Sequence, residues 1–190
     1  MRYDPETHHR RSIRLPGYDY AIEGAYFITI CTEDKECLFG NIHDGIMAPN
    51  AMGKIVQACW LDLPKHFRHV DLDAFVLMPN HMHGIVVVRE RGEALATRSE
   101  NLEEDRRANA SPLHVPPHGT TPQSLSAIVQ NLKSVSTRRI NRVNRTPGRT
   151  IWQRNYYEHI IRSQKSLDAI RQYIEINPTG WLEDPEYSTL

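Results

Sequence analysis

The sequence predicts an α+β fold: a four-stranded antiparallel sheet with helices on one face and a further helix at its C-terminal end. Three observations predict it. Short runs of β-branched and aromatic residues alternate with segments whose apolar residues recur at helical spacing. The predicted elements follow one another in the order β-α-β-β-α-β-α. Two of the strands are joined only by a tight Pro-Asn link, so they are expected to pair antiparallel.

The first half of the chain supplies three strands and one helix. Residues 25–32 (AYFITICT) are rich in β-branched and aromatic side chains, which favours a strand. Residues 33–49 predict a turn and a short hairpin-like excursion. Residues 50–67 place apolar side chains at helical spacing, and residues 73–79 and 81–89 predict the antiparallel pair.

The second half begins with a change of character. Residues 90–122 combine charge, Ala, Ser and prolines with almost no periodic apolar signal, which indicates a flexible insertion. Residues 124–144 then predict an amphipathic helix, residues 151–162 a fourth strand, and residues 163–178 a helix that stops at a proline. This order belongs to the split β-α-β arrangement of ferredoxin-like and RRM-like folds.

The chain has 190 residues, which suits one folded domain. We expect a basic N-terminal arm (1–24), one domain (25–182) that contains the insertion, and a C-terminal tail (183–190). The N-terminus lacks the apolar stretch of a signal peptide, and no apolar run approaches the length of a membrane span. A cytoplasmic protein without a membrane partner is therefore expected. The three cysteines include no CxxC pair, which favours reduced thiols.

Charge is segregated although the formal net charge is zero. Residues 106–157 contain no Asp or Glu but many cations, a pattern that suits a phosphate chain. The N-terminal arm carries a second small basic cluster. The alternative is a solvated basic helix face without a ligand. The candidate DNA-contacting residues are Arg10, Arg11, Arg14, Lys133, Arg138, Arg139, Arg142, Arg145 and Arg154.

Two histidines form a candidate metal site. His81 and His83 are two residues apart on a predicted strand, so both imidazoles leave the same face of the sheet. Two ligands on one face can share one ion. The alternative is a structural pair in which one histidine only hydrogen-bonds a loop.

A tyrosine and an asparagine form the second candidate element. Tyr173 and Asn177 are at positions i and i+4 of the last predicted helix, so they share one face. A nucleophile and an amide ligand would then lie side by side; the alternative is a border packing residue and a helix C-cap. Tyr156 and Tyr157 are rival nucleophiles, but on a strand they point to opposite faces and belong better to a core and a base-stacking surface.

Three segments together resemble a known family. They are MPNHMHGIVVV, the upstream RRSIRLPGYDY with GAYFITICT, and IWQRNYYEHIIR with QYIEINP. The chain resembles the REP-associated tyrosine transposases, a branch of the single-tyrosine HUH endonucleases, over nearly its whole length except residues 90–122. The resemblance makes residues 25–182 an HUH transposase domain.

The resemblance implies roles for individual residues. His81, His83 and Asn177 would hold a divalent ion, Mg²⁺ or Mn²⁺, and Tyr173 would attack DNA to give a 5′-phosphotyrosine and a free 3′-OH. Asparagine at position 177 favours the REP-associated branch, because insertion-sequence members commonly have glutamine there. The implied partner is single-stranded DNA or a hairpin formed by a REP-like palindrome, bound by a monomer or a homodimer.

Two other functions compete with this one. The first is a non-catalytic nucleic-acid-binding module of RRM-like fold, although the aromatic RNP signature is missing. The second is a zinc hydrolase that uses the HxH pair, which needs a further His or Asp ligand and an activated water. The substitution Tyr173→Phe separates them, because only the transposase depends on the phenol.

Overall fold

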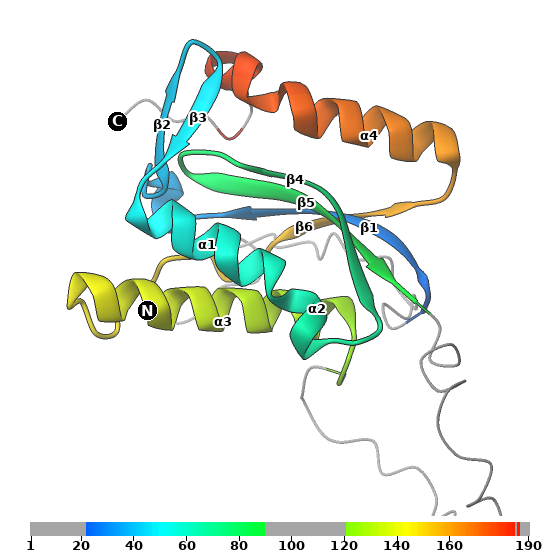
Figure 1. Ribbon diagram of the computed structural model, residues 1–190, viewed down its shortest axis with the longest axis horizontal. Coiled ribbons are helices and arrows are strands. Elements are labelled where there is room, and N and C mark those ends of the chain that lie inside the picture. Colours follow the sequence, from blue (N-terminus) through cyan, green and yellow to red (C-terminus); the bar gives the residue numbers. More distant parts are fainter. Residues whose placement is uncertain (1–21, 90–120, 185, 187–190) are drawn as a thin grey trace, which may run out of the picture.

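The computed structural model has a four-stranded antiparallel sheet at its centre (Figure 1). Its strands lie in the order β4-β5-β1-β6, with all neighbours antiparallel, which confirms the predicted fold class. The strands are β1 (Gly24–Cys31), β4 (Val70–Leu77), β5 (His81–Val88) and β6 (Tyr157–Ile161). The structure describes residues 22–89, 121–184 and 186.

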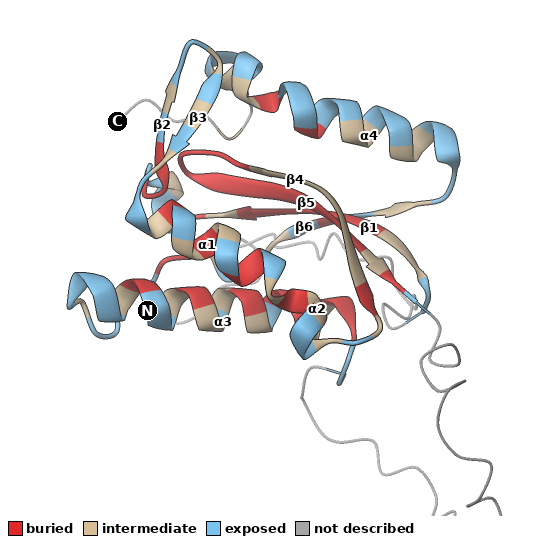
Figure 2. Ribbon diagram, in the orientation of Figure 1, coloured by how far each residue is buried: buried red, intermediate tan, exposed pale blue. Residues whose placement is uncertain are grey.

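Three helices cover one face of the sheet: α1 (Ala51–Leu61), α2 (Leu63–His66) and α3 (Leu125–Asn144). Alternate residues of β1 and β5 point into this face and are almost fully buried, as are the sheet-facing side chains of α1 and α3 (Figure 2). These residues form the main hydrophobic cluster, which includes Tyr26, Ile28, Ile30, Trp60, Met82, Val86, Ile128 and Leu132.

A glycine of β5 makes room for the largest side chain of this cluster. A Cβ atom at Gly84 would lie 2.5 Å from the indole ring of Trp60, closer than real Cβ contacts come. The indole itself stacks on Phe75 of β4, with ring centroids 5.0 Å apart. The absence of a side chain at position 84 therefore lets α1 approach the middle of the sheet.

The opposite face carries the C-terminal helix α4 (Gln164–Ile176), which continues into the 3₁₀ segment η3 (Asn177–Glu183). Its apolar stripe packs with Phe27 and Ile85 in a second, smaller cluster. The helix packs chiefly over β4, where Arg171 forms an ion pair with Asp73 at 2.6 Å. The predicted arrangement, with a separate C-terminal helix bearing Tyr173, is thus confirmed.

A hairpin of β2 (Gly40–His43) and β3 (Ile46–Pro49) follows the short 3₁₀ turn η1 (Glu33–Lys35), as the sequence predicted for residues 33–49. Its tip lies beside η3 (Figure 1). A Cβ atom at Gly45 would come within 2.9 Å of the Thr179 side chain, and the φ of Gly45 is +72°. A glycine therefore suits the tip for both conformation and space.

Several predicted boundaries are wrong; β4, for example, begins at Val70 instead of residue 73. The helix predicted over residues 50–67 is broken at Asp62, because Pro64 in the first turn of α2 cannot donate a backbone hydrogen bond to the preceding turn. The strand predicted over residues 151–162 begins only at Tyr157. The carbonyl oxygens of residues 153–155 accept hydrogen bonds from the ammonium group of Lys133 instead of from a neighbouring strand.

The expected division into arm, domain, insertion and tail falls largely outside the described residues. Residues 1–21 and 90–120 are not described, and neither is most of the tail. Asp184 and Glu186 of the expected tail are described, and both pack against the sheet near β5. Among the described residues no helix is long and apolar enough to cross a membrane.

Candidate metal and nucleophile site

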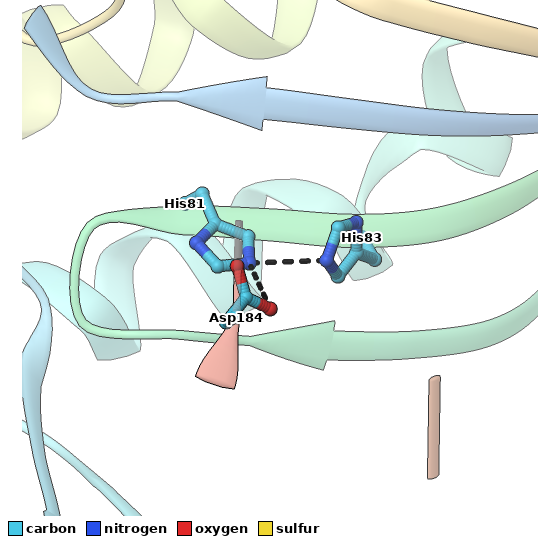
Figure 3. Close-up of side chains that lie close together, drawn as sticks. All are labelled: His81, His83 and Asp184. Carbon is cyan, nitrogen blue, oxygen red and sulfur yellow. Dashed lines mark hydrogen bonds and ion pairs between the residues drawn. The ribbon is translucent and has the colours of Figure 1, made fainter. Parts of the chain in front are cut away.

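His81 and His83 lie on the α4 side of β5, and their ring nitrogens converge. The two Nε2 atoms are 3.0 Å apart, as the close-up in Figure 3 shows. The side chains are 0% and 2% exposed. Thr29 and Cys31 of β1 lie directly opposite them in the sheet, so they share this face. The period of two in a strand therefore places both imidazoles as the sequence predicted.

The Nδ1 atom of each imidazole has a hydrogen-bond partner. The amide of Asn80 donates to the carbonyl oxygens of Lys35 and Glu186, so its Oδ1 must face His81 Nδ1, 2.8 Å away. That nitrogen therefore carries the proton, and His81 Nε2 keeps a lone pair. The Nδ1 atom of His83 lies 2.8 Å from the Thr29 hydroxyl, which can donate or accept. Such partners orient imidazole ligands.

Burial keeps both imidazoles neutral. It lowers the pKa of His81 to about 3, helped by the charge of Lys35. Burial also lowers the pKa of His83 to about 3, with His81 as the second cause. At neutral pH both rings are therefore unprotonated on one nitrogen, which is the form that binds a metal ion.

Tyr173 reaches this pair from α4. Its hydroxyl lies 3.3 Å from His83 Nε2, and its ring makes an edge contact with Phe27 at a centroid distance of 6.1 Å. Tyr173 is 39% exposed, so the residue contacts both the buried pair and solvent. Burial raises the pKa of Tyr173, with the negative charge of Asp184 as the next cause. The phenol is thus protonated at neutral pH and needs a cation to become a nucleophile.

Asn177 lies one helical turn after Tyr173 and is 6% exposed. It is the C-cap residue of α4, yet its side chain turns inward. The Nδ2 atom donates to Asp184 Oδ2 at 3.0 Å. Its Oδ1 atom is buried and has no hydrogen-bond partner among the described residues. A buried acceptor of this kind costs about 1–3 kcal/mol unless something binds it.

Asp184 completes the cluster, although no sequence motif predicts it. Its Oδ2 atom lies 3.9 Å from His81 Nε2, and potential ligand atoms of Asp184, His81 and His83 all lie within 4.8 Å of one another (Figure 3). The residue follows η3, whose turns carry the chain back to β5. No periodicity marks the segment WLEDPEY, so only the three-dimensional path of η3 identifies Asp184.

The chain after η3 is anchored beside the histidines. Glu186 forms an ion pair with Lys35 at 3.1 Å and accepts a hydrogen bond from the Cys31 thiol at 3.4 Å. The Trp181 ring lies 6.0 Å from that of His81. Burial, and then Glu186, raises the pKa of Cys31 to about 12, so this thiol stays protonated and is a poor metal ligand.

The candidate DNA-contacting residues that the structure describes lie away from this site. Helix α3, which carries most of them, covers the opposite face of the sheet. Lys133 is engaged by three carbonyl oxygens and lies over the Tyr156 ring, and Arg139 pairs with Asp62. The other described candidates are exposed: Arg138, Arg142, Arg145 and Arg154. Outside the described residues lie Arg10, Arg11 and Arg14.

The two rival tyrosines separate across the sheet. Tyr156 packs against the main hydrophobic cluster, and its hydroxyl lies 3.3 Å from that of Ser126 on α3. Tyr157 is 44% exposed and makes an edge contact with Phe27 on the α4 face, at a centroid distance of 6.3 Å. Of the two, only Tyr157 therefore shares a face with the histidines.

Comparison with known proteins agrees with this arrangement. The family model described as "Transposase IS200 like" matches residues 113–177, which include Tyr173 and Asn177. A protein of Haemophilus influenzae described only as uncharacterized is 42% identical over 186 residues, which cover 98% of this chain and 97% of that one. A solved REP-associated tyrosine transposase bound to a REP hairpin shares the fold, with a TM-score of 0.54. The identity is 18%, over 88% of this chain and 73% of that chain.

The family predicted from the sequence motifs is thereby confirmed. The matched segment contains the predicted nucleophile, and the sheet and α4 bring that segment to the histidines of β5. This membership supports a transposase-type, DNA-cleaving role. The chain belongs to the IS200-like transposase family.

Proposed function

We propose that this protein is a metal-dependent endonuclease and transposase that cleaves and rejoins single-stranded DNA at hairpin, REP-like palindromes through a covalent 5′-phosphotyrosine. One observation carries the proposal: the Tyr173 hydroxyl lies 3.3 Å from Nε2 of His83, beside a cluster of neutral and acidic metal ligands. Nucleophile and ligand set thus meet at one point, although 90 residues of sequence separate them.

The donor set suits Mg²⁺ or Mn²⁺. His81 and His83 offer Nε2 lone pairs, and Asp184 offers a carboxylate. Asn177 offers its buried Oδ1 atom, which has no hydrogen-bond partner in the described part of the chain. Oxygen donors suit both ions, and imidazole is tolerated better by Mn²⁺. When bound, the ion would supply positive charge to a non-bridging phosphate oxygen and to the attacking phenol. With one carboxylate in the set, the ion keeps net positive charge.

The residues of the chain then divide the chemistry. The Tyr173 hydroxyl gives up its proton, its oxygen bonds to phosphorus, and the bond from phosphorus to the 3′ oxygen breaks. The 3′ oxygen takes a proton and leaves as a 3′-OH. Attack of a 3′-OH on the phosphotyrosine reverses these steps and rejoins DNA without a further energy source. Asn177 lies one turn from the phenol on α4, and its amide acts on the Tyr173 pKa in the opposite sense to burial, lowering it.

The hairpin specificity in this proposal rests on two supports. The solved relative with the same fold is described as bound to a REP hairpin. The exposed cations of α3 and the residues after it would contact the phosphate backbone of a stem. The arm with Arg10, Arg11 and Arg14 is proposed for the same task.

The decisive experiment incubates the protein with Mg²⁺ or Mn²⁺ and with 5′- or 3′-labelled hairpin oligonucleotides that carry single-stranded flanks. A protein-linked band is expected with the 3′-labelled fragment, because the 5′ phosphate becomes attached to tyrosine. Tyr173→Phe is expected to abolish this band and to leave DNA affinity within a few-fold. An undiminished band with Tyr173→Phe would overturn the assignment, and so would full cleavage in EDTA.

A zinc hydrolase remains the second candidate, and Asp184 is the observation that favours it. Two histidines and one aspartate match the three-ligand sites of catalytic zinc, which activate a water. The two candidates differ in their covalent intermediate. If Tyr173→Phe hydrolyses DNA as fast as the wild type and Zn²⁺ supports the reaction best, the hydrolase is correct.

A further inference from the structure

The face of the sheet that carries α4 and Tyr173 is covered unevenly. Helix α4 packs over β4, and Arg171 ties that flank to Asp73. The edge strand β6 lies at the other side of the sheet. Its residues on the α4 face, Tyr157 and His159, are exposed, as is Arg162 directly after the strand. We call these three residues the β6 edge surface.

The β6 edge surface is in line with the site. Across the sheet, Thr29 of β1 lies opposite His83 of β5 on one side and opposite Tyr157 of β6 on the other. Two strand spacings, about 10 Å, therefore separate the backbones at His83 and Tyr157. That distance is on the order of the length of one nucleotide.

An aromatic residue joins the two tyrosines. Phe27 makes edge contacts with both Tyr173 and Tyr157 and stacks on the His83 ring at 5.4 Å. Phe27 itself is only 8% exposed, because the two phenol rings and the apolar side chains of α4 pack around it. A planar apolar ligand that approaches Tyr173 along this line meets the Tyr157 ring next.

The backbone that leads into Tyr157 is held by its neighbours. The ammonium of Lys133 donates to the carbonyl oxygens of the three residues before Tyr156, and Tyr156 is itself partly buried against the main cluster. Burial lowers the pKa of this Lys133 ammonium to about 8. The chain therefore enters β6 in a fixed conformation, so the backbone at Tyr157 loses little freedom when the ring binds a ligand.

We propose that Tyr157 stacks on the base of the nucleotide next to the scissile phosphate. This inference rests on the proposed function, since it takes a phosphodiester at Tyr173 as its starting point. The ligand is single-stranded DNA, because aromatic rings stack on any base and Arg162 places positive charge where the backbone continues. Tyr157 is a positioning residue, because its ring acts on the base and leaves the phosphorus to Tyr173.

The test compares Tyr157→Phe, Tyr157→Trp and Tyr157→Leu with the wild type, and with Leu61→Ala as a control on the opposite side of the sheet. Affinity is measured on a hairpin with a single-stranded flank and on the same hairpin without the flank. Tyr157→Leu is expected to lose about 5- to 150-fold in affinity for the flanked DNA only. The Phe, Trp and Leu61→Ala proteins should stay within about threefold.

A second readout identifies the base. In a Tyr173→Phe background, 2-aminopurine is placed at each flank position in turn, and quenching is expected at one position next to the cleavage site. Quenching should disappear with Tyr157→Leu. An abasic nucleotide at that position should remove the difference between wild type and Tyr157→Leu.

Three results would overturn the inference. They are unchanged affinity and quenching with Tyr157→Leu, loss of the protein-linked band with Tyr157→Phe, and conversion of a dimer into a monomer by Tyr157→Leu. The second result would make Tyr157 the nucleophile, and the third would make the β6 edge surface an interface between copies of the chain. A wild type that forms no covalent band overturns the proposed function instead, while the quenching experiment still tests the stacking.

Discussion

The two faces of the sheet are made by the same strands but differ in what they bury. The face under α1 and α3 is apolar almost throughout and is filled by residues such as Tyr26, Trp60 and Ile128. The face under α4 buries two imidazoles, an amide and a carboxylate beside a small apolar cluster. The first face gains free energy from burial. The face under α4 gains less free energy from burial, because it buries polar groups that need a ligand.

The largest expected effects come from one substitution on each face, compared for DNA cleavage and for stability. Tyr173→Phe is expected to abolish the covalent DNA adduct while changing the free energy of unfolding by less than about 1 kcal/mol. Ile128→Ala on α3 is expected to cost about 2–5 kcal/mol of stability and to leave cleavage per folded molecule unchanged. Denaturant titration and the adduct assay measure the two effects. Any loss of stability with Tyr173→Phe comparable to that of Ile128→Ala would break the comparison.

The next effect concerns pH. The folded protein holds the pKa of His81 and His83 at about 3, against 6.5 for the ordinary imidazole. Between these values the unfolded chain binds protons that the folded chain does not, so stability is full above pH 6.5 and falls as pH drops towards 3. At pH 4.5 the expected loss is about 2–3 kcal/mol per imidazole.

Denaturation in EDTA at pH 7 and pH 4.5 checks this prediction. His83→Gln should make the dependence shallower, whereas His66→Gln, an exposed histidine of α2, should keep it. A dependence of equal steepness in the two variants would show that the buried pair does not control it.

A smaller effect is expected from the hydroxyl that supports His83. Thr29→Val removes the partner of Nδ1 and keeps the shape of the side chain. We expect affinity for Mn²⁺ to fall by about 10- to 100-fold, because an unsupported imidazole loses its orientation. Isothermal titration measures it, with Thr150→Val at an exposed position as the matched control. Equal affinities in the two variants would exclude a supporting role for Thr29.

The smallest effect separates two cations of α3. Lys133→Met is expected to lower stability by about 1–3 kcal/mol, since it leaves three carbonyl oxygens without their donor. Arg138→Ala should leave stability within about 0.5 kcal/mol, because the side chain is exposed. If the basic face binds DNA, Arg138→Ala should also reduce the salt dependence of binding. Thermal denaturation and salt-dependent anisotropy measure the two outcomes.

The elements with a strong local period were predictable. A period of two places His81 and His83 on one face, and a period of 3.6 places Tyr173 and Asn177 on one flank, so each pair could be derived from its own segment. The four-stranded antiparallel sheet followed from the order of elements, because the split β-α-β arrangement has few alternatives. The meeting of the two pairs was implied by the family resemblance and is shown by the fold.

Contacts between distant segments were not predictable in the same way. Asp184 comes to the histidines only because η3 turns the chain back, and no local pattern encodes that path. The charge of Lys133 predicts a contact with DNA, whereas its hydrogen bonds to the carbonyl oxygens of residues 153–155 follow from no local pattern. The same carbonyl oxygens lie in the segment that the sequence predicts as the start of the fourth strand. The strand starts only at Tyr157, and the partner of these oxygens is 20 residues and more away.

The glycine after His83 links the two faces. Trp60 occupies the space that any side chain at position 84 would need, so the chemical groups of β5 are set against the helix behind the sheet. Gly84→Ala would push β5 away from α1 or displace the indole, and either movement tilts the imidazole next door. A single methyl group on the side of the sheet that faces α1 would thus disturb the imidazole positions on the side that faces α4. The protein has no freedom to vary this position independently of its chemistry.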